Sequence, residues 1–313
     1  MTKHLIAAVL AVFLVASTAG AAQKDQGVYV KVFDGMKANI SDTAKKAGEA
    51  LKAGGFEVLA TYENGAPEGC RFRAMTIVFT KADYAQKVTS AGGEKAFALP
   101  LRFSLYEDEK GLNGAFMNPV SIDRTIFQGA SMDGEALKVL DEAIAALRKT
   151  GPVSVKQIGP IRDSGDITGM GGGPFPEKVV KSASSSKSPA ELADALGRVN
   201  SSGWHAIYTY KVSPTVAIVG LSNAKTEGRA FGIAGESRSS SSYRFPGLDH
   251  AAAFPVEVVL VRQGNSTSAL ILKEMWRMKL YFQDAGNWAF MKNMGMPGQI
   301  QDEVEAAVRT VVK

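Results

Sequence analysis

The chain repeats one succession of patterns in its two halves, and this repetition limits the folds open to it more than any other feature. In the first half, a helical pattern over residues 41–53 ends at Gly54 and Gly55, and the strand-like stretch GFEVLATYE follows. In the second half, SPAE at residues 188–191 predicts a capping box that opens a helix, and GWHAIYTYK follows from Gly203. Each half is therefore expected to start with a strand and then a helix, which ends at glycine and leads into a further strand.

Four further pairs of segments follow in the same order, which convergent strand composition alone rarely produces. They are MTIVFT (75–80) with VAIVGLS (216–222), LPLRFSLYEDEKG (99–111) with FPVEVVLVRQGN (254–265), NGAFM (113–117) with NWAFM (287–291), and amphipathic helices at 133–149 and 298–313. The third pair predicts about 19 extra residues before the last strand of the second copy. The segment SALILKEMWRMKLYF (268–282) is then expected to form a long hairpin.

These patterns predict an α+β protein made of two tandem copies of a small antiparallel-sheet domain with helices packed on one face. The expected divisions are a signal peptide at 1–21, a first copy at 28–150, a Gly/Pro-rich linker at 151–177 and a second, divergent copy at 178–313.

Composition and cysteine content narrow the class of protein. A short basic start, an apolar run and small residues near position 20 predict export to the periplasm or beyond, with no integral membrane segment after cleavage. The single cysteine, Cys70, excludes an internal disulfide and cysteine-based zinc sites. The formal net charge of +5 is spread without a dense basic stripe, so we expect no nucleic-acid partner. No metal site or cofactor is predicted.

The first copy resembles the domain-of-unknown-function family 302 of bacteria and archaea. The resemblance covers residues 28–150 and is carried by a helix ending in GF, a strand near IVF, the run LPLRFSLYEDEKG and a strand closing at Asn118 and Pro119. Over residues 178–313 it is degenerate, because the acidic YED is lost. The resemblance implies a small α+β domain that is often dimeric and has no established catalytic activity.

The segments 99–111 and 254–265 differ on one strand face. Residues Arg102, Ser104 and Tyr106 correspond to Glu257, Val259 and Val261, so a polar face has become largely apolar. We expect the apolar face to be covered and the polar face of the first copy to stay accessible. Neutral drift on a surface strand is an equally good interpretation.

The candidate ligand-binding residues are Arg71, Arg73, Arg102, Tyr106 and Glu107, which together suit a carboxylate or phosphate. An ordinary salt-bridged sheet edge is the plainer interpretation. No catalytic residue is assigned.

The sequence favours an exported non-enzymatic binding or scaffold protein in which the two domains form an internal pseudo-dimer. A small anionic ligand or another envelope protein is the expected partner. The alternative is an envelope enzyme or redox accessory that uses Cys70 or the face carrying Arg102, Tyr106 and Glu107.

Overall fold

The computed structural model describes residues 26–162 and 179–312. The predicted signal peptide and residues 163–177 of the predicted linker lie outside the described residues. The described chain is an α+β protein with two antiparallel sheets of six strands each, and one continuous hydrophobic core runs through it.

The first sheet has the strand order β2-β3-β4-β5-β1-β6, and all its neighbours pair antiparallel. Its strands are β1 (Gln26–Met36), β2 (Glu57–Glu63), β3 (Ala74–Thr80), β4 (Leu101–Asp108), β5 (Gly111–Met117) and β6 (Lys156–Arg162). Strand β6 lies in the segment expected to be linker and pairs with β1 at the edge of the sheet.

The second sheet has the order β7-β12-β11-β10-β9-β8 and is also antiparallel throughout. Its strands are β7 (Val179–Ser185), β8 (Asn200–Ser201), β9 (Trp204–Ser213), β10 (Val216–Ser222), β11 (Val256–Gln263) and β12 (Ser266–Leu272). Taken in chain order, β7, β9, β10, β11 and β12 occupy the same relative places as β1, β2, β3, β4 and β5.

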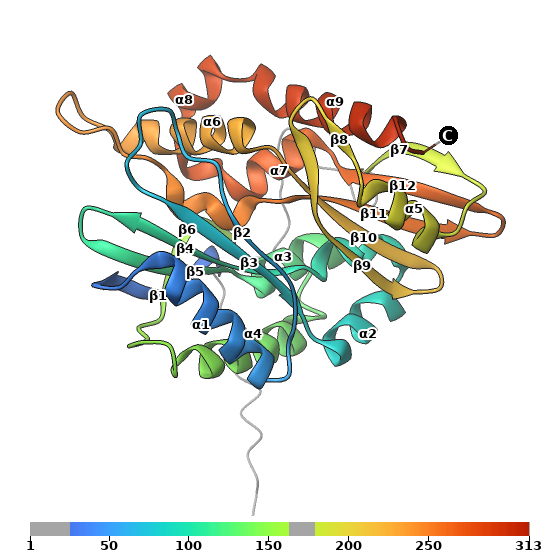
Figure 1. The fold of residues 1–313 in the computed structure, drawn as a ribbon, viewed down its shortest axis with the longest axis horizontal. Coiled ribbons are helices and arrows are strands. Elements are labelled where there is room, and N and C mark those ends of the chain that lie inside the picture. Colours follow the sequence, from blue (N-terminus) through green and yellow to red (C-terminus); the bar gives the residue numbers. More distant parts are fainter. Residues whose placement is uncertain (1–25, 163–178, 313) are drawn as a thin grey trace, which may run out of the picture.

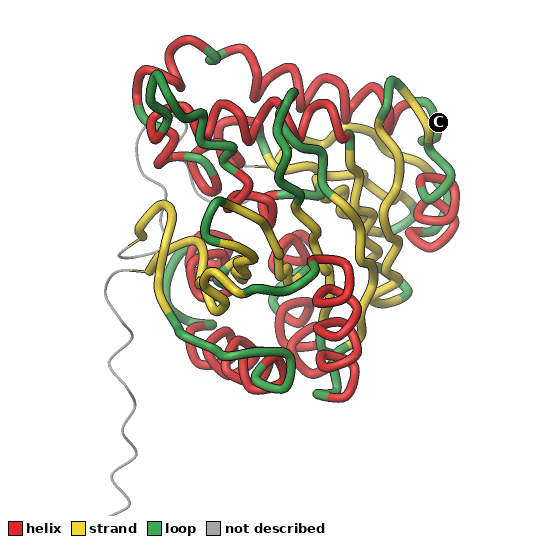
Figure 2. The backbone as a smooth tube through the Cα atoms, turned by 60° about the vertical axis from the view of Figure 1, so that its left-hand side comes forward, coloured by secondary structure: helices red, strands yellow, loops and turns green. Residues whose placement is uncertain are grey.

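The helices lie mainly on the outer sides of the two sheets. Figure 1 shows α1, α2 and α4 along the lower side and α6, α8 and α9 along the upper side, and Figure 2 shows the strands between these helical layers. The α-helices are α1 (Ile40–Ala53), α2 (Ala82–Ser90), α3 (Pro119–Phe127), α4 (Asp133–Leu147), α5 (Pro189–Leu196), α6 (Ala224–Gly235), α7 (Glu274–Tyr281), α8 (Asn287–Lys292) and α9 (Gly295–Arg309). The 3-10 helices are η1 (Gly93–Ala98), η2 (Glu236–Arg238), η3 (Leu248–Ala253) and η4 (Gln283–Ala285).

The first helix of each half starts and stops by local chemistry. Asn39 caps α1 by accepting from the backbone N–H of Asp42, and Ser188 with Glu191 forms the predicted capping box on α5. The glycine before the next strand has a left-handed backbone in both halves, with φ of 83° at Gly55 and 85° at Gly203. A side chain there would be strained, which explains why the turn uses glycine twice.

The predicted match of residues 113–117 with 287–291 is wrong. Residues 113–117 lie in β5, whereas 287–291 lie in helix α8. The strand equivalent to β5 is β12, and the expected long hairpin at 268–282 is instead the end of β12 followed by α7. The two segments have similar sequences but different structures, because a short, mostly apolar run of five residues suits a helix as well as a strand.

The two sheets face one another across a seam, and each half contributes a short 3-10 helix to the other. Helix η3 of the second half packs on β3, β4 and β5 of the first sheet, and η1 of the first half packs on β10 and β11. Val259 and Val261 are buried beneath this contact. A Cβ atom added at Gly93 in η1 would lie 2.8 Å from the Val261 side chain, so this approach is close.

A second contact across the halves joins the loop after β2 to helix α6. Buried Glu227 of α6 accepts hydrogen bonds from the Gly65 backbone N–H at 2.8 Å and the Asn64 side chain at 3.2 Å. It also accepts from the Ser222 hydroxyl at 2.6 Å. A Cβ atom at Gly228 would lie 2.2 Å from the Ala66 carbonyl oxygen, so the loop backbone rests directly on the helix.

We predict that Gly228→Ala destabilises the protein by about 1–3 kcal/mol, because the added methyl group must displace a backbone carbonyl of the other half. Urea unfolding followed by circular dichroism measures the change. Gly298→Ala in α9 is the matched control: nothing lies within 4 Å of its added Cβ. We expect that control to be neutral or to stabilise by up to about 1 kcal/mol. Equal effects of the two substitutions would contradict the close contact.

Candidate functional site

The polar strand face of the first half is buried, so the expectation that it stays accessible is wrong. Arg102 is 1% exposed and Tyr106 is 5% exposed. The cause is the second half, whose helix η3 covers this face. Thr76, on the neighbouring strand, donates a hydrogen bond to the Ala251 carbonyl of η3 at 3.4 Å. The corresponding strand segments of the two halves, 99–111 and 254–265, therefore both line the seam.

Arg102 binds the second half through three groups. Its Nη1 lies 3.1 Å from Glu257 Oε1 and donates to the Pro255 carbonyl at 3.1 Å. Its Nη2 donates to the Tyr281 hydroxyl at 2.8 Å. Glu257 also faces Arg277, whose Nη1 lies 3.5 Å from Glu257 Oε2. One buried carboxylate is thus held between two buried guanidinium groups, of which one comes from the other half.

Burial and ion pairing have opposite effects on the pKa values of these two arginines. Burial acts to lower the pKa of Arg102, but the Glu257 carboxylate and the Tyr281 side chain outweigh it and hold the pKa above its ordinary value. Burial dominates at Arg277 and lowers its pKa. Arg102 is therefore firmly charged, and its charge depends on a partner from the other half.

Arg102 and Glu257 occupy the same place in the two halves. Each is the second residue of its strand, in β4 and β11, and each pairs with the equivalent neighbouring strand, at Val78 of β3 and Gly220 of β10. The seam therefore brings one strand position into contact with its own counterpart, and the two carry opposite charges.

The other predicted site residues lie apart from this contact. Glu107 accepts from the Arg73 backbone N–H at 3.0 Å, while the Arg73 side chain pairs with Glu63 at 2.8 Å. Arg71 is exposed and lies 3.9 Å from Glu109. The assignment of the five predicted residues to ligand binding stays a prediction, and the structure separates them between the buried seam and the exposed end of the sheet.

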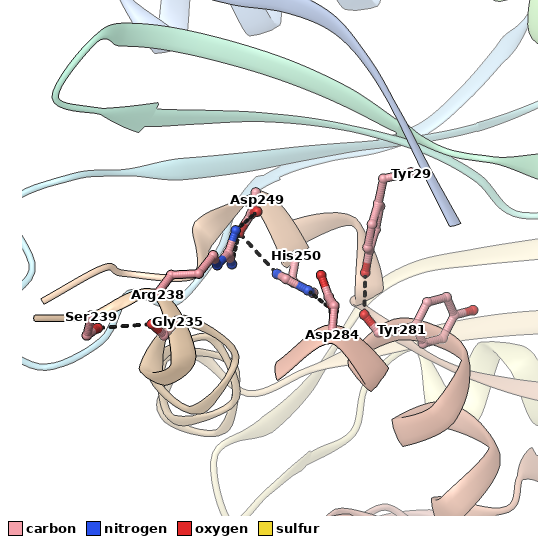
Figure 3. Close-up of polar contacts among 8 residues, drawn as sticks. All are labelled: Tyr29, Gly235, Arg238, Ser239, Asp249, His250, Tyr281 and Asp284. Atoms are coloured by element: carbon pink, nitrogen blue, oxygen red, sulfur yellow. Dashed lines mark hydrogen bonds and ion pairs between the residues drawn. The ribbon is translucent and has the colours of Figure 1, made fainter. Parts of the chain in front are cut away.

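A second buried cluster surrounds His250 of η3 (Figure 3). Its Nδ1 lies 3.0 Å from Asp249 and its Nε2 lies 2.9 Å from Asp284. Arg238 holds the other side of Asp249 through two contacts of 2.5 and 2.9 Å. The Phe282 ring stacks on the imidazole with centroids 5.5 Å apart. Tyr29 of the first half meets the imidazole edge-on at 5.4 Å.

The two carboxylates keep His250 protonated. Burial alone would lower the pKa of His250, but contacts with Asp249 and Asp284 outweigh it and raise the pKa to about 9. Burial likewise acts to raise the pKa of Asp249, yet His250 and Arg238 hold that pKa well below its usual value. With His250 only 1% exposed and both nitrogens engaged, this cluster is an ionic clamp at the seam.

Two surface hollows lie where the loop after β2 crosses α6. The first, here called the basic cleft, has a volume of about 840 Å³ and is lined by Glu68 of the first half and by Lys225, Arg229 and Arg244 of the second. The second has a volume of about 310 Å³ and adjoins it at Pro67, Glu68 and Arg244. Its lining includes Cys70, Arg71, Glu109 and Tyr243. Cys70 is partly buried, and its thiol lies 3.6 Å from the Phe72 carbonyl.

Sequence reasoning missed the basic cleft, because its walls are more than 150 residues apart in the chain and meet only when the halves dock. One signal was available. Gly228 and Gly232 are four residues apart in the α6 segment, and two small residues at that spacing share a helix face and permit close backbone approach. Arg71 is the predicted site residue that lines the adjoining hollow.

Within residues 26–162 and 179–312, no group of three or more His, Cys, Asp or Glu side chains is placed to hold a metal ion. In the same ranges, no helix combines the length and apolar character needed to cross a membrane.

Comparisons with known proteins place few constraints on the chain. No family model matches it, and neither does any curated protein. Among solved structures, the chain is similar to the crystal structure of an uncharacterised conserved DUF302 protein from Bacillus stearothermophilus. The two share 13% sequence identity with a TM-score of 0.34, and the match covers 40% of this chain and 98% of that one.

We predict that Arg102→Met lowers the free energy of unfolding by about 3–5 kcal/mol, because it removes one partner of a buried ion pair. The double variant with Glu257→Gln should cost less than the sum of the single variants, with a coupling of about 1–3 kcal/mol. Urea unfolding of the four proteins measures the cycle. Lys211→Met is the control, since Lys211 and Asp194 form an exposed pair at 2.8 Å that should contribute below about 1 kcal/mol. Additive effects of Arg102 and Glu257 would refute the coupling.

We predict that stability falls between about pH 6.5 and pH 9 because of His250. Its pKa is higher in the folded state, so the folded protein binds more protons across this range. The contribution is complete below the unfolded pKa and is lost as the pH rises through about 9, with a limit of about 3 kcal/mol.

Urea unfolding at a series of pH values, compared between the native protein and His250→Gln, isolates this contribution. The exposed His205→Gln should leave the profile unchanged. An NMR titration of the His250 ring in the native protein provides a direct reading. A His250 pKa near its ordinary value would show that the clamp is wrongly assigned.

Proposed function

We propose that this chain is an exported, non-enzymatic binding protein built from two tandem copies of a family-302-like domain that form an internal pseudo-dimer, and that it binds a small anionic ligand in the basic cleft. The export is proposed from the apolar, small-residue segment at 1–21. The duplication is supported by the equal order of five strands in the two sheets and by the contact of Arg102 with its counterpart Glu257.

The observation that carries the binding role is the position of the basic cleft at the junction of the halves. Its walls come from the loop after β2, which Glu227 anchors, from α6, and from the segment after α6 that carries Arg244. The buried hydrogen bonds of the loop and the packing of α6 fix the backbone of two of these walls, which reduces the ordering cost of binding a ligand.

The charges in the cleft suit an anion. Lys225, Arg229 and Arg244 line it together with Glu68 and Glu236, and Lys292 pairs with Glu236. Arg229 Nη1 donates to Gln299 at 2.9 Å. Neither Lys225 nor Arg244 forms an ion pair with another residue in the described part of the chain, so both are available to a carboxylate or phosphate.

The buried polar clusters are assigned to architecture and not to ligand binding. Arg102, Glu257 and His250 are each at most 3% exposed and are engaged with one another's halves. A ligand would have to separate the halves to reach them, whereas the basic cleft is open at the surface.

Calorimetric titration with inorganic phosphate and with acetate tests the proposal. We expect saturable binding at low ionic strength that weakens about tenfold in Arg244→Gln and in Lys225→Gln, since each loses a charge-assisted hydrogen bond. Added salt should weaken binding as well.

Lys211→Gln is the matched control, because it removes an exposed cation on β9 outside the cleft lining. The native protein and this variant should bind alike. Equal loss in all three variants would point to general surface charge and would exclude the cleft. No binding by the native protein would refute the anion site itself.

A further inference from the structure

The second half contains an apolar cavity of about 80 Å³ next to the basic cleft, and this cavity is partly open to solvent. Its wall is made of side chains from α6, α7, α8, α9, β11, β12 and the residues next to these elements, among them Phe254, Phe282, Phe290, Met278, Met296 and Ile300. A cavity with such a lining excludes water and accepts hydrocarbon.

The polar residues at this cavity are already bonded to protein. Arg277 donates to the Ala253 carbonyl at 2.7 Å, and Asn293 donates to the Ala289 carbonyl at 2.9 Å. Gln301 donates to Glu305 at 2.8 Å. Because these groups already have hydrogen-bond partners, a polar group of a ligand would form few hydrogen bonds inside the cavity. The part of a ligand that fits here is therefore apolar.

The apolar cavity and the basic cleft share two wall residues, Ile233 of α6 and Asn293 just after α8. Helix α6 thus contributes cationic side chains to the cleft and apolar side chains to the cavity. A molecule that spans both parts needs an anionic head for Lys225 and Arg244 and an apolar chain for the cavity.

We propose that the apolar cavity and the basic cleft form one site for an anionic amphiphile, a molecule with a carboxylate or phosphate head and an alkyl chain. This inference rests on the proposed anion site and specifies its ligand class. The cavity volume limits the chain, because a methylene group takes roughly the 30 Å³ share of a liquid water molecule and about three methylenes fill 80 Å³.

A homologous series of straight-chain carboxylates from acetate to decanoate, kept below micelle-forming concentrations, tests the site in calorimetric titrations of the full chain. Affinity should rise about fourfold for each of about three methylenes that enter the cavity and then level off. Hexyl phosphate compared with hexanoate distinguishes a phosphate head from a fatty-acid head. Hexan-1-ol, which has the chain but no charge, should bind more weakly than either.

Ile300→Trp fills the cavity from α9 and should abolish the increase with chain length while acetate binds as in the native protein. Ala234→Leu is a milder filling variant that serves if the tryptophan prevents folding. Arg244→Gln should weaken every member of the series by the same factor, which separates the contribution of the head from that of the chain.

The two proposals fail in different ways. Acetate binding without any increase along the series would keep the anion site and overturn the amphiphile. An increase that survives both filling variants would also overturn it, because the chain would then lie elsewhere. No binding of any carboxylate or phosphate would remove the anion site and the amphiphile together.

Discussion

The architecture depends on a buried charge contact between two strands that hold the same place in their sheets. Arg102 and Glu257 are nearly sealed from water, and an ion taken out of water without its partner costs several kcal/mol. The second half therefore supplies the carboxylate that makes buried Arg102 tolerable, and Arg102 adds to the pairing that Glu257 already has with Arg277. Because Arg102 also binds Pro255 and Tyr281, the contact fixes the orientation of the sheets as well as their proximity.

This seam decides where a ligand can bind. The groups with the strongest intrinsic chemistry are committed to architecture: Arg102 and Glu257 join the halves, and His250, held between two carboxylates of its own half, packs against Tyr29 of the other. Access is left at the edge of the seam, where the loop after β2 lies on α6 and two adjoining hollows are open at the surface. The anchoring hydrogen bonds to Glu227 are buried, and burial raises the pKa of this carboxyl. The contact of the loop with α6, like the contact of Arg102 with Glu257, thus depends on packing between the two halves.

The sequence was sufficient for the fold class and for the helix-to-strand turn in each half, because amphipathic spacing and the glycine turns at Gly55 and Gly203 are local signals. The prediction of a strand at residues 287–291 was wrong, because a mostly apolar pentapeptide fits a helix and a strand equally well. Sequence reasoning also placed Arg102 on an accessible face, since side-chain alternation shows which residues share a face but not what covers that face. The basic cleft was out of reach for a related reason: its lining exists only after two distant segments dock.

The opposite charges at the seam also make each half selective for its partner. If two first halves met through the same surface, two guanidinium groups would be buried face to face, and two second halves would bury two carboxylates. Two buried guanidinium groups without a carboxylate are strongly unfavourable, and the carboxylates of two second halves would have only Arg277 of their own half as a cationic partner, so the seam favours the mixed pairing. Because the halves are joined in one chain, Arg102 and Glu257 always meet each other, and neither position has to be compatible with itself. The covalent link and the charge difference therefore favour the same pairing of the two halves.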